Sequence, residues 1–429
     1  MAQRIAIVDG VRTPFCRAGG ALKGVGADDL GALVVRELLA RTGVGPGQVD
    51  EVIFGAVAQP AEAMNPARVI ALKAGLPERT IAHTVQRNCA SGMQAITTAA
   101  LQIASGESEI AIAGGTESMS RYPLLFGPKM TDLFMRLFKA KTLGARLAAL
   151  ASFRPGFLKP VVALQLGLTD SVCGLNMGQT AEVLARDFGI RREEQDAFAL
   201  MSHQRAVRAR EEGRLAEETM PLIPAPEYDA VQTEDDGPRV GQTMEALAKL
   251  RPYFDRHAGT VTVGNACPVT DGAAAVLMCT ERRAAEMGLE PIGFLRGWAY
   301  AALDGRRMGL GPVHATARLL DRHRLRLRDF DRIEMNEAFA AQVIANERAF
   351  ASHAFAREQL GRSKAVGDID RGRLNVNGGA IALGHPVGAT GTRLVLTLLK
   401  ELVRSGGRAG LATLCVGGGQ GAALALEAA

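Results

Sequence analysis

Residues 89–116 read CASGMQAITTAALQIASGESEIAIAGGT, and residues 385–419 read HPVGATGTRLVLTLLKELVRSGGRAGLATLCVGGG. Each segment starts with a glycine-containing helix start, continues as an apolar helix that stops at Ser-Gly, and closes with a strand ending in glycines. Self-similarity of this kind indicates an internal repeat. The sequence therefore predicts that one unit of helix and strand is duplicated, with Cys89 and His385 at the start of corresponding helices.

The segments around both copies alternate between strand-like and helix-like patterns. RIAIVDG, DDLGALVVRELLARTG and EVIFGAVAQ precede the first copy, and FDRIEMNEAFAAQVIANERAF precedes the second. Such alternation is typical of parallel β-α-β units, so the fold class is α/β. IAHTV, residues 81–85, is short and rich in β-branched residues. We expect it to form a buried strand that leads to Cys89.

The pattern changes between about residues 121 and 255. Charged helix-like sequence such as RREEQDAFALMSHQRAVRAREEGRL and the proline-rich run MPLIPAPEYD indicate an inserted region of helices and loops. We therefore predict an N-terminal domain of residues 1–120 and 256–288, an inserted loop domain of 121–255, and a C-terminal domain of 289–429.

The insertion begins with a strongly basic stretch. Residues 121–159 contain eight Lys and Arg residues but one acid, Asp132. Helical spacing places five apolar residues on one face: Met130, Leu133, Phe134, Leu137 and Phe138. Such a helix can lie on a membrane, dock on a partner protein or fold back on its own domain. We favour an external surface, because an internal element does not need so one-sided a charge.

Composition narrows the class of protein. The chain has 429 residues, too many for one hydrophobic core, so two or three domains are expected. A net charge of +5 is too small for a typical nucleic-acid-binding protein, but it suits an anionic small ligand.

The six cysteines include no CxxC pair and no metal-ligand spacing with histidine, so we expect reduced thiols and no metal site. The first residues, MAQRIAIVDG, show no secretory or transit segment, and no apolar run reaches membrane-spanning length. These features predict a cytoplasmic protein, either free or peripheral to the membrane.

Cys89 stands between a predicted strand and a predicted helix. The positive end of a helix dipole favours an anion, so a thiol at this position is expected to titrate below its usual pKa and to act as a nucleophile. The alternative is a buried structural cysteine, because free cysteine is among the most buried residue types.

Three further residues occupy similar junctions. His385 lies in a glycine-dense turn before a helix, Cys415 ends a strand, and Asn336 follows another strand. Each alone has a structural explanation, as a core histidine, a buried thiol or a capping asparagine. Strand ends and helix starts collect along one crevice of a parallel sheet, so all four residues are predicted to converge there.

NCASGMQAI, GGTESMS, NEAFAAQ, GHPVGATGTR and CVGGGQGAA resemble, in order, the signature segments of the thiolases. The resemblance spans nearly the whole chain apart from the basic stretch. It implies a fold of duplicated αβ domains in layers α/β/α/β/α with an inserted loop domain. The implied activity is acyl transfer between CoA thioesters.

The resemblance also implies residue roles. Cys89 matches the nucleophile that keeps the shortened acyl group, and His385 matches its base. Cys415 matches the acid that protonates the departing enolate of acetyl-CoA and later deprotonates the incoming CoA. Asn336 matches the residue that holds a water at the enolate oxygen. The backbone N–H groups of Cys89 and Gly417 match the oxyanion donors.

Coenzyme A is implied as co-substrate, with no permanently bound cofactor, and the chain is expected to be a homodimer or homotetramer. Cys267 and Met177 are the implied contacts to CoA or substrate. Many relatives have serine where this chain has Cys267 followed by Pro268.

Two features of the chain point to different subfamilies. The basic stretch resembles that of thiolase subunits of trifunctional β-oxidation complexes, where it meets a membrane or an α-subunit. Those subunits typically carry histidine in place of Asn336. We favour a 3-ketoacyl-CoA thiolase of fatty-acid β-oxidation over an acetoacetyl-CoA thiolase. A decarboxylating ketoacyl synthase would lack Cys415, and a non-catalytic lipid carrier would not need the four converging residues.

Overall fold

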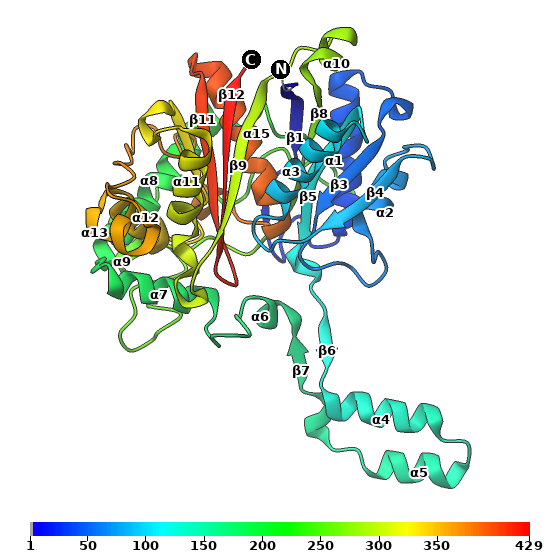
Figure 1. Cartoon of the computed structure of the whole chain (residues 1–429). Coiled ribbons are helices and arrows are strands. Elements are labelled where there is room, and N and C mark those ends of the chain that lie inside the picture. Colours follow the sequence, from blue (N-terminus) through cyan, green and yellow to red (C-terminus); the bar gives the residue numbers. More distant parts are fainter. Residues whose placement is uncertain (1–2) are drawn as a thin grey trace.

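The computed structural model describes residues 3–429 and is built around one large mixed sheet (Figure 1). Its strand order is β10-β11-β12-β9-β1-β8-β5-β3-β4, and β2 (Cys16–Arg17) pairs with β8 beside this path. The strands, in that order, are Arg332–Met335, Ala409–Val416, Gln420–Ala428, Gly293–Ala302, Ile5–Arg12, Thr270–Thr280, Ile110–Ser118, Glu51–Gly55 and Ile81–Val85.

The pairing pattern repeats outward from the junction of β1 and β9. In the N-terminal half, β1 pairs antiparallel with β8, β8 antiparallel with β5, and β5 parallel with β3. In the C-terminal half, β9 pairs antiparallel with β12, β12 antiparallel with β11, and β11 parallel with β10. The identical order of orientations confirms the duplication predicted from the sequence.

Helices cover the sheet in three layers. α3 (Ser91–Ser105) and α15 (Val387–Ser405) pack against each other between the two halves; α3 contacts strands of the N-terminal half, and α15 contacts strands of both. α1 (Ala27–Thr42) and α2 (Pro66–Lys73) cover the outer side of the N-terminal half. α11 (Gly311–His323) and α12 (Ala340–Ala351) cover the outer side of the C-terminal half. The implied α/β/α/β/α layering is confirmed.

The crossing of α3 and α15 depends on two glycines. A Cβ atom on Gly92 would lie 2.6 Å from the backbone nitrogen of Thr392, and one on Gly391 would lie 2.5 Å from that of Met93. Any side chain at either position would push the helices apart. Because Cys89 and His385 immediately precede these helices, the close crossing also brings the two residues toward each other.

The insertion leaves the sheet after β5 and returns at β8. Its elements are η2 (Met119–Arg121), β6 (Leu124–Phe126), α4 (Pro128–Lys139), α5 (Leu143–Ala151), η3 (Pro155–Leu158), β7 (Pro160–Val162), α6 (Ala163–Gly167), α7 (Met177–Asp187), α8 (Arg192–Glu211) and α9 (Met244–Ala248). The remaining short elements are η1 (Pro46–Gln48), α10 (Glu281–Glu286), η4 (Gly305–Leu310), η5 (Leu327–Asp329), α13 (His353–Leu360) and α14 (Ala380–Leu383). The predicted domain boundaries remain our proposal.

Residues 121–162 form what we call the basic hairpin, in which α4 and α5 extend away from the body on the β6–β7 stem (Figure 1). Helix α4 carries the predicted apolar face, but α5 covers part of it. Met130 and Leu133 are buried against Ala149 of α5, whereas Phe134 and Phe138 are exposed. Two packed helices divide the apolar residues between an internal and an external side.

Strand β4 also differs from its prediction. The composition of IAHTV predicts a buried strand, yet β4 is the outermost strand of the sheet, and within residues 3–429 it pairs only with β3. Ile81 is 59% exposed. β-branched residues favour strands at an edge as well as in a core, so composition alone does not separate the two.

Candidate active site

The four junction residues lie at the carboxyl ends of strands or just before helices. Cys89 and His385 stand at equivalent positions, each two residues before its helix. Asn336 directly follows β10, and Cys415 is the penultimate residue of β11, which pairs parallel with β10. The structure therefore collects these residues at one edge, as expected for a doubly covered α/β sheet.

His385 is held by a hydrogen bond that fixes its tautomer. The Thr390 hydroxyl donates to the Pro386 carbonyl at 2.9 Å and lies 2.6 Å from Nδ1 of His385. A hydroxyl has one proton, so Thr390 must accept from Nδ1–H, which leaves Nε2 with a free lone pair. Burial, followed by the nearby charge of Arg393, lowers the pKa of His385 to about 3. The imidazole is neutral and can accept a proton.

Asn336 is fully buried beside this histidine. Its backbone N–H donates to the Thr413 carbonyl at 3.0 Å, and its Nδ2 lies 3.5 Å from Nε2 of His385. Its Oδ1 accepts no hydrogen bond from any residue within 3–429. The amide nitrogen of Asn336 thus faces the unprotonated Nε2 of His385.

The pKa of Cys89 is raised, which corrects the prediction of a lowered value. Burial of the thiol is the largest cause, and the charge of Glu117 adds to it. The backbone N–H groups of Gly417 and of Cys89 itself oppose this shift without reversing it. Desolvation outweighs the helix dipole, so Cys89 rests as a thiol and needs a base to become a nucleophile.

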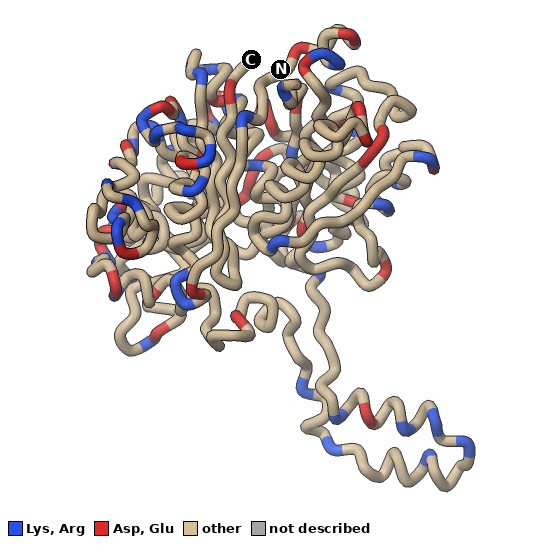
Figure 2. Tube along the Cα trace, viewed as in Figure 1, with Lys and Arg blue, Asp and Glu red and all other residues tan. Residues whose placement is uncertain are grey.

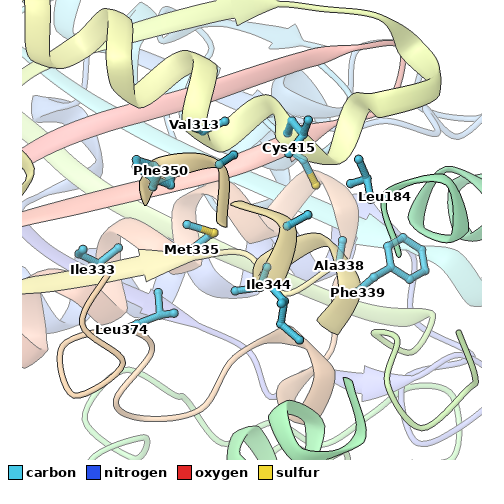
Figure 3. Close-up of a cluster of buried hydrophobic side chains, with 14 of the residues drawn as sticks. Leu184, Val313, Ile333, Met335, Ala338, Phe339, Ile344, Phe350, Leu374 and Cys415 are labelled. Carbon is cyan, nitrogen blue, oxygen red and sulfur yellow. The ribbon is translucent and has the colours of Figure 1, made fainter. Parts of the chain in front are cut away.

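Cys415 and Cys267 belong to the same group of thiols. Cys415 is buried at the edge of a cluster that includes Ala338 and Phe339 (Figure 3). Burial, then the proximity of Cys89 and Cys267, raises the pKa of Cys415 well above the usual value. Burial and Cys89 raise that of Cys267 to about 12, and its N–H donates to the Ala338 carbonyl at 3.0 Å. Three protonated thiols therefore lie near one another.

A cavity of about 640 Å³ opens onto Cys89. Its wall includes Met177, a predicted contact to CoA or substrate, and Gly417, a predicted oxyanion donor, but not Cys267. The apolar part of the wall comes largely from residues at the start of the basic hairpin or on either side of it in the sequence: Met119, Tyr122, Pro123, Ala163, Leu168 and Val172. This volume and lining suit an acyl chain attached to a polar carrier.

Glu117, within GGTESMS, was assigned no role from the sequence. Its carboxylate accepts from the backbone N–H groups of Val57, Ala58 and Gly388 and from the Tyr122 hydroxyl, each at 3.0 Å. Burial raises its pKa to about 7. It ties two parts of the cavity wall to the start of α15. The available signal in the sequence is an acid two residues after the apolar and glycine run IAIAGG.

Two family models match the chain, and together they cover almost all of it. The family model "Thiolase, N-terminal domain" matches residues 5–282, and "Thiolase, C-terminal domain" matches residues 289–428. A 3-ketoacyl-CoA thiolase of Yersinia enterocolitica is 47% identical, over 99% of this chain and 97% of its own length. One of Pectobacterium carotovorum is 46% identical, over 99% and 96%.

Solved structures show the same fold. The Bacillus anthracis acetyl-CoA acetyltransferase superposes with a TM-score of 0.88 at 38% identity, covering 100% of this chain and 99% of its own. Human mitochondrial 3-ketoacyl-CoA thiolase in complex with CoA superposes with a TM-score of 0.86 at 35% identity, covering 100% and 98%. The chain belongs to the thiolase family.

Proposed function

We propose that this protein is a 3-ketoacyl-CoA thiolase, an acyltransferase that cleaves 3-ketoacyl-CoA with CoA to acetyl-CoA and a shortened acyl-CoA. The observation that carries the proposal is the neutral His385, with Nε2 unprotonated, at the same strand-end edge as the half-buried thiol of Cys89 and the buried thiol of Cys415. A base and two protonated sulfur acids are the groups that such a cleavage needs.

In the first half-reaction, Nε2 of His385 takes the thiol proton of Cys89, and the resulting thiolate attacks the 3-keto carbon. The N–H groups of Cys89 and Gly417 stabilise the oxyanion. The bond between C2 and C3 breaks, and its electron pair leaves as the enolate of acetyl-CoA. Asn336, through a water, and His385 stabilise the enolate oxygen. Cys415 gives its proton to the enolate carbon, and the acyl group stays on Cys89.

In the second half-reaction, the Cys415 thiolate takes the proton of the incoming CoA thiol. The CoA sulfur attacks the thioester carbonyl on Cys89, and acyl-CoA leaves. Protonated His385 returns its proton to the Cys89 sulfur. The protons of both half-reactions balance among Cys89, His385, Cys415 and the substrates.

The cavity supports substrates longer than acetoacetyl-CoA. A volume of about 640 Å³ beside Cys89, with an apolar wall, leaves room for an acyl chain of several methylenes. Each buried methylene contributes about 0.8 kcal/mol, so kcat/KM should rise from acetoacetyl-CoA to medium-chain 3-ketoacyl-CoA substrates.

Ala163→Trp tests this chain-length assignment. Ala163 lines the cavity and is only half-buried, so an indole there should fill acyl space without disrupting the fold. Loss of room for three methylenes corresponds to about 50-fold in kcat/KM for the longer substrate. Acetoacetyl-CoA should react nearly as before. Gln165→Trp, exposed on the same short helix and outside the cavity wall, is the control. Equal loss on both substrates would contradict the assignment.

We also propose that the basic hairpin binds an anionic membrane surface. Figure 2 shows blue Lys and Arg positions along the hairpin and one red position, in accord with eight basic residues and one acid in 121–159. Large apolar side chains are exposed beside them, including Leu125, Phe126, Phe138 and Leu143. Within the described part of the chain no helix is long and apolar enough to cross a membrane. A homodimer or homotetramer remains a prediction.

Vesicle co-sedimentation tests the membrane proposal. The protein should bind vesicles containing anionic lipid, and binding should weaken with salt, because each basic residue near the surface contributes about 1 kcal/mol that salt screens. Phe134→Ser/Phe138→Ser should reduce binding, whereas Val240→Ser/Val403→Ser, also exposed but on the body, should not.

Two other outcomes would overturn the membrane proposal. A pull-down of a protein partner that depends on the same two phenylalanines, without vesicle binding, would assign the hairpin to a protein interface. A lowered melting temperature on deletion of 130–150, with no binding of either kind, would assign it to internal packing.

A further inference from the structure

Asn88, directly before the proposed nucleophile, has a left-handed backbone conformation. Its backbone φ is +43°, a value that residues other than Gly, Asn and Asp rarely adopt. The turn closes around it, because the backbone N–H of Ser91 donates to its carbonyl at 3.0 Å and the Ser91 hydroxyl does so at 2.7 Å. Asparagine meets this requirement while keeping an amide that can reach another segment.

That amide reaches the other half of the molecule. Nδ2 of Asn88 donates to the carbonyl of Gly417 at 2.8 Å, across 329 positions of sequence. Asn88 and Gly417 both line the cavity beside Cys89. A second bond runs in parallel, from Nη1 of Arg87 to Oε1 of Gln420 at 2.9 Å. The nucleophile turn and the turn between β11 and β12 are therefore joined at two points.

The turn that receives these bonds consists of glycines, and it is also held by the Leu303 N–H, which donates to the Gly419 carbonyl at 2.8 Å. Three consecutive glycines, 417 to 419, connect β11 to β12, and the last two have φ values of +89° and +79°. Glycine loses more conformational freedom on ordering than any other residue. The Gly417 carbonyl belongs to the peptide plane after its N–H, so holding this carbonyl fixes ψ at Gly417 and stops the turn from swinging away from Cys89.

We propose that Asn88 is a positioning residue that holds the Gly417 N–H in place as oxyanion donor for Cys89. The inference rests on the proposed function, in which that N–H receives negative charge in the acyl-transfer transition state. Asn88 does not touch the reacting atoms; it acts through the peptide that does. Fixed donors matter because they need no reorganisation when charge develops.

Two variants separate the amide from the backbone requirement. Asn88→Gly keeps access to positive φ but removes the hydrogen bond, and Asn88→Asp keeps size and φ tolerance but cannot donate to a carbonyl. Loss of one oxyanion donor typically costs about 10²- to 10³-fold in kcat, so loss of its support should cost roughly 10- to 100-fold. Gln86→Ala is the control. Gln86 is exposed and its side-chain amide donates to Oδ1 of Asn88, so its loss leaves the bond from Asn88 to Gly417 and should leave kcat near wild type.

Alkylation of Cys89 by iodoacetamide distinguishes a specific loss of Gly417 positioning from a general distortion of the active site. Displacement of iodide forms no oxyanion, so at pH values where Cys89 is ionised both variants should alkylate within about threefold of wild type while thiolysis falls by the larger factor, mainly in kcat. The comparison is made at those pH values because the Gly417 N–H also lowers the pKa of Cys89, so its displacement alone would slow alkylation at neutral pH. Rates are taken across pH, so that any shift in the thiol pKa caused by the new charge of Asn88→Asp is separated. If one variant fails to fold, the other decides.

The proposal is overturned if both folded variants keep wild-type kcat, or if alkylation falls as far as thiolysis. Formation of an acyl adduct on wild-type Cys89 is measured alongside. Absence of that adduct would refute the proposed function itself, whereas an adduct in wild type with unchanged kcat in the Asn88 variants would refute the positioning role alone.

Discussion

Cys415→Ser and His385→Ala should each lose at least 100-fold in turnover, and they should lose different steps. A positioned acid or base typically supplies about 10²- to 10⁴-fold in rate. In Cys415→Ser the hydroxyl is too weak an acid to protonate the enolate, but Cys89 and its base remain. In His385→Ala no group removes the Cys89 proton, whose pKa is already raised by burial.

Two measurements separate these failures. Exchange of the α-protons of acetyl-CoA with deuterated solvent should be lost in Cys415→Ser, while alkylation of Cys89 continues. Alkylation at neutral pH should fall sharply in His385→Ala. Cys279→Ser, which removes a buried thiol of β8 outside the cavity wall, controls for loss of a sulfur in the core.

A clear result would contradict these roles. If Cys415→Ser keeps more than about a tenth of wild-type turnover, its acid-base role is wrong. If the rate of Cys89 alkylation near neutral pH is unchanged in His385→Ala, another group removes the thiol proton. His385 would then not be the base.

Much of the fold was predictable because the helices and strands follow from the local spacing of apolar residues and glycines in the sequence. The duplicated helix-and-strand unit appears in the sequence as two similar segments, and the structure repeats it as identical orders of strand orientation. The junction positions of Cys89, His385, Asn336 and Cys415 follow from strand and helix patterns alone. Their convergence follows from a general property of parallel strands.

The electrostatics of the site were not predictable in the same way. A helix start suggests a lowered pKa for Cys89, but burial by segments distant in sequence raises it. Glu117 gathers donors from three other segments, and Asn88 bonds a glycine 329 positions away. The apolar face of α4 is divided because α5 packs against it. Such effects depend on which segments meet, and local periodicity does not contain that information.

Cys89 carries the acyl group in the proposed mechanism, and mass spectrometry of the acylated enzyme tests this role most directly. Wild-type protein mixed with 3-ketooctanoyl-CoA, without free CoA, should release acetyl-CoA and retain a hexanoyl thioester on the peptide containing Cys89. Addition of CoA should remove the adduct as hexanoyl-CoA, and Cys89→Ser should form none. An adduct confined to Cys415 would contradict the assignment of the nucleophile, and no adduct on any cysteine would favour a non-catalytic lipid carrier.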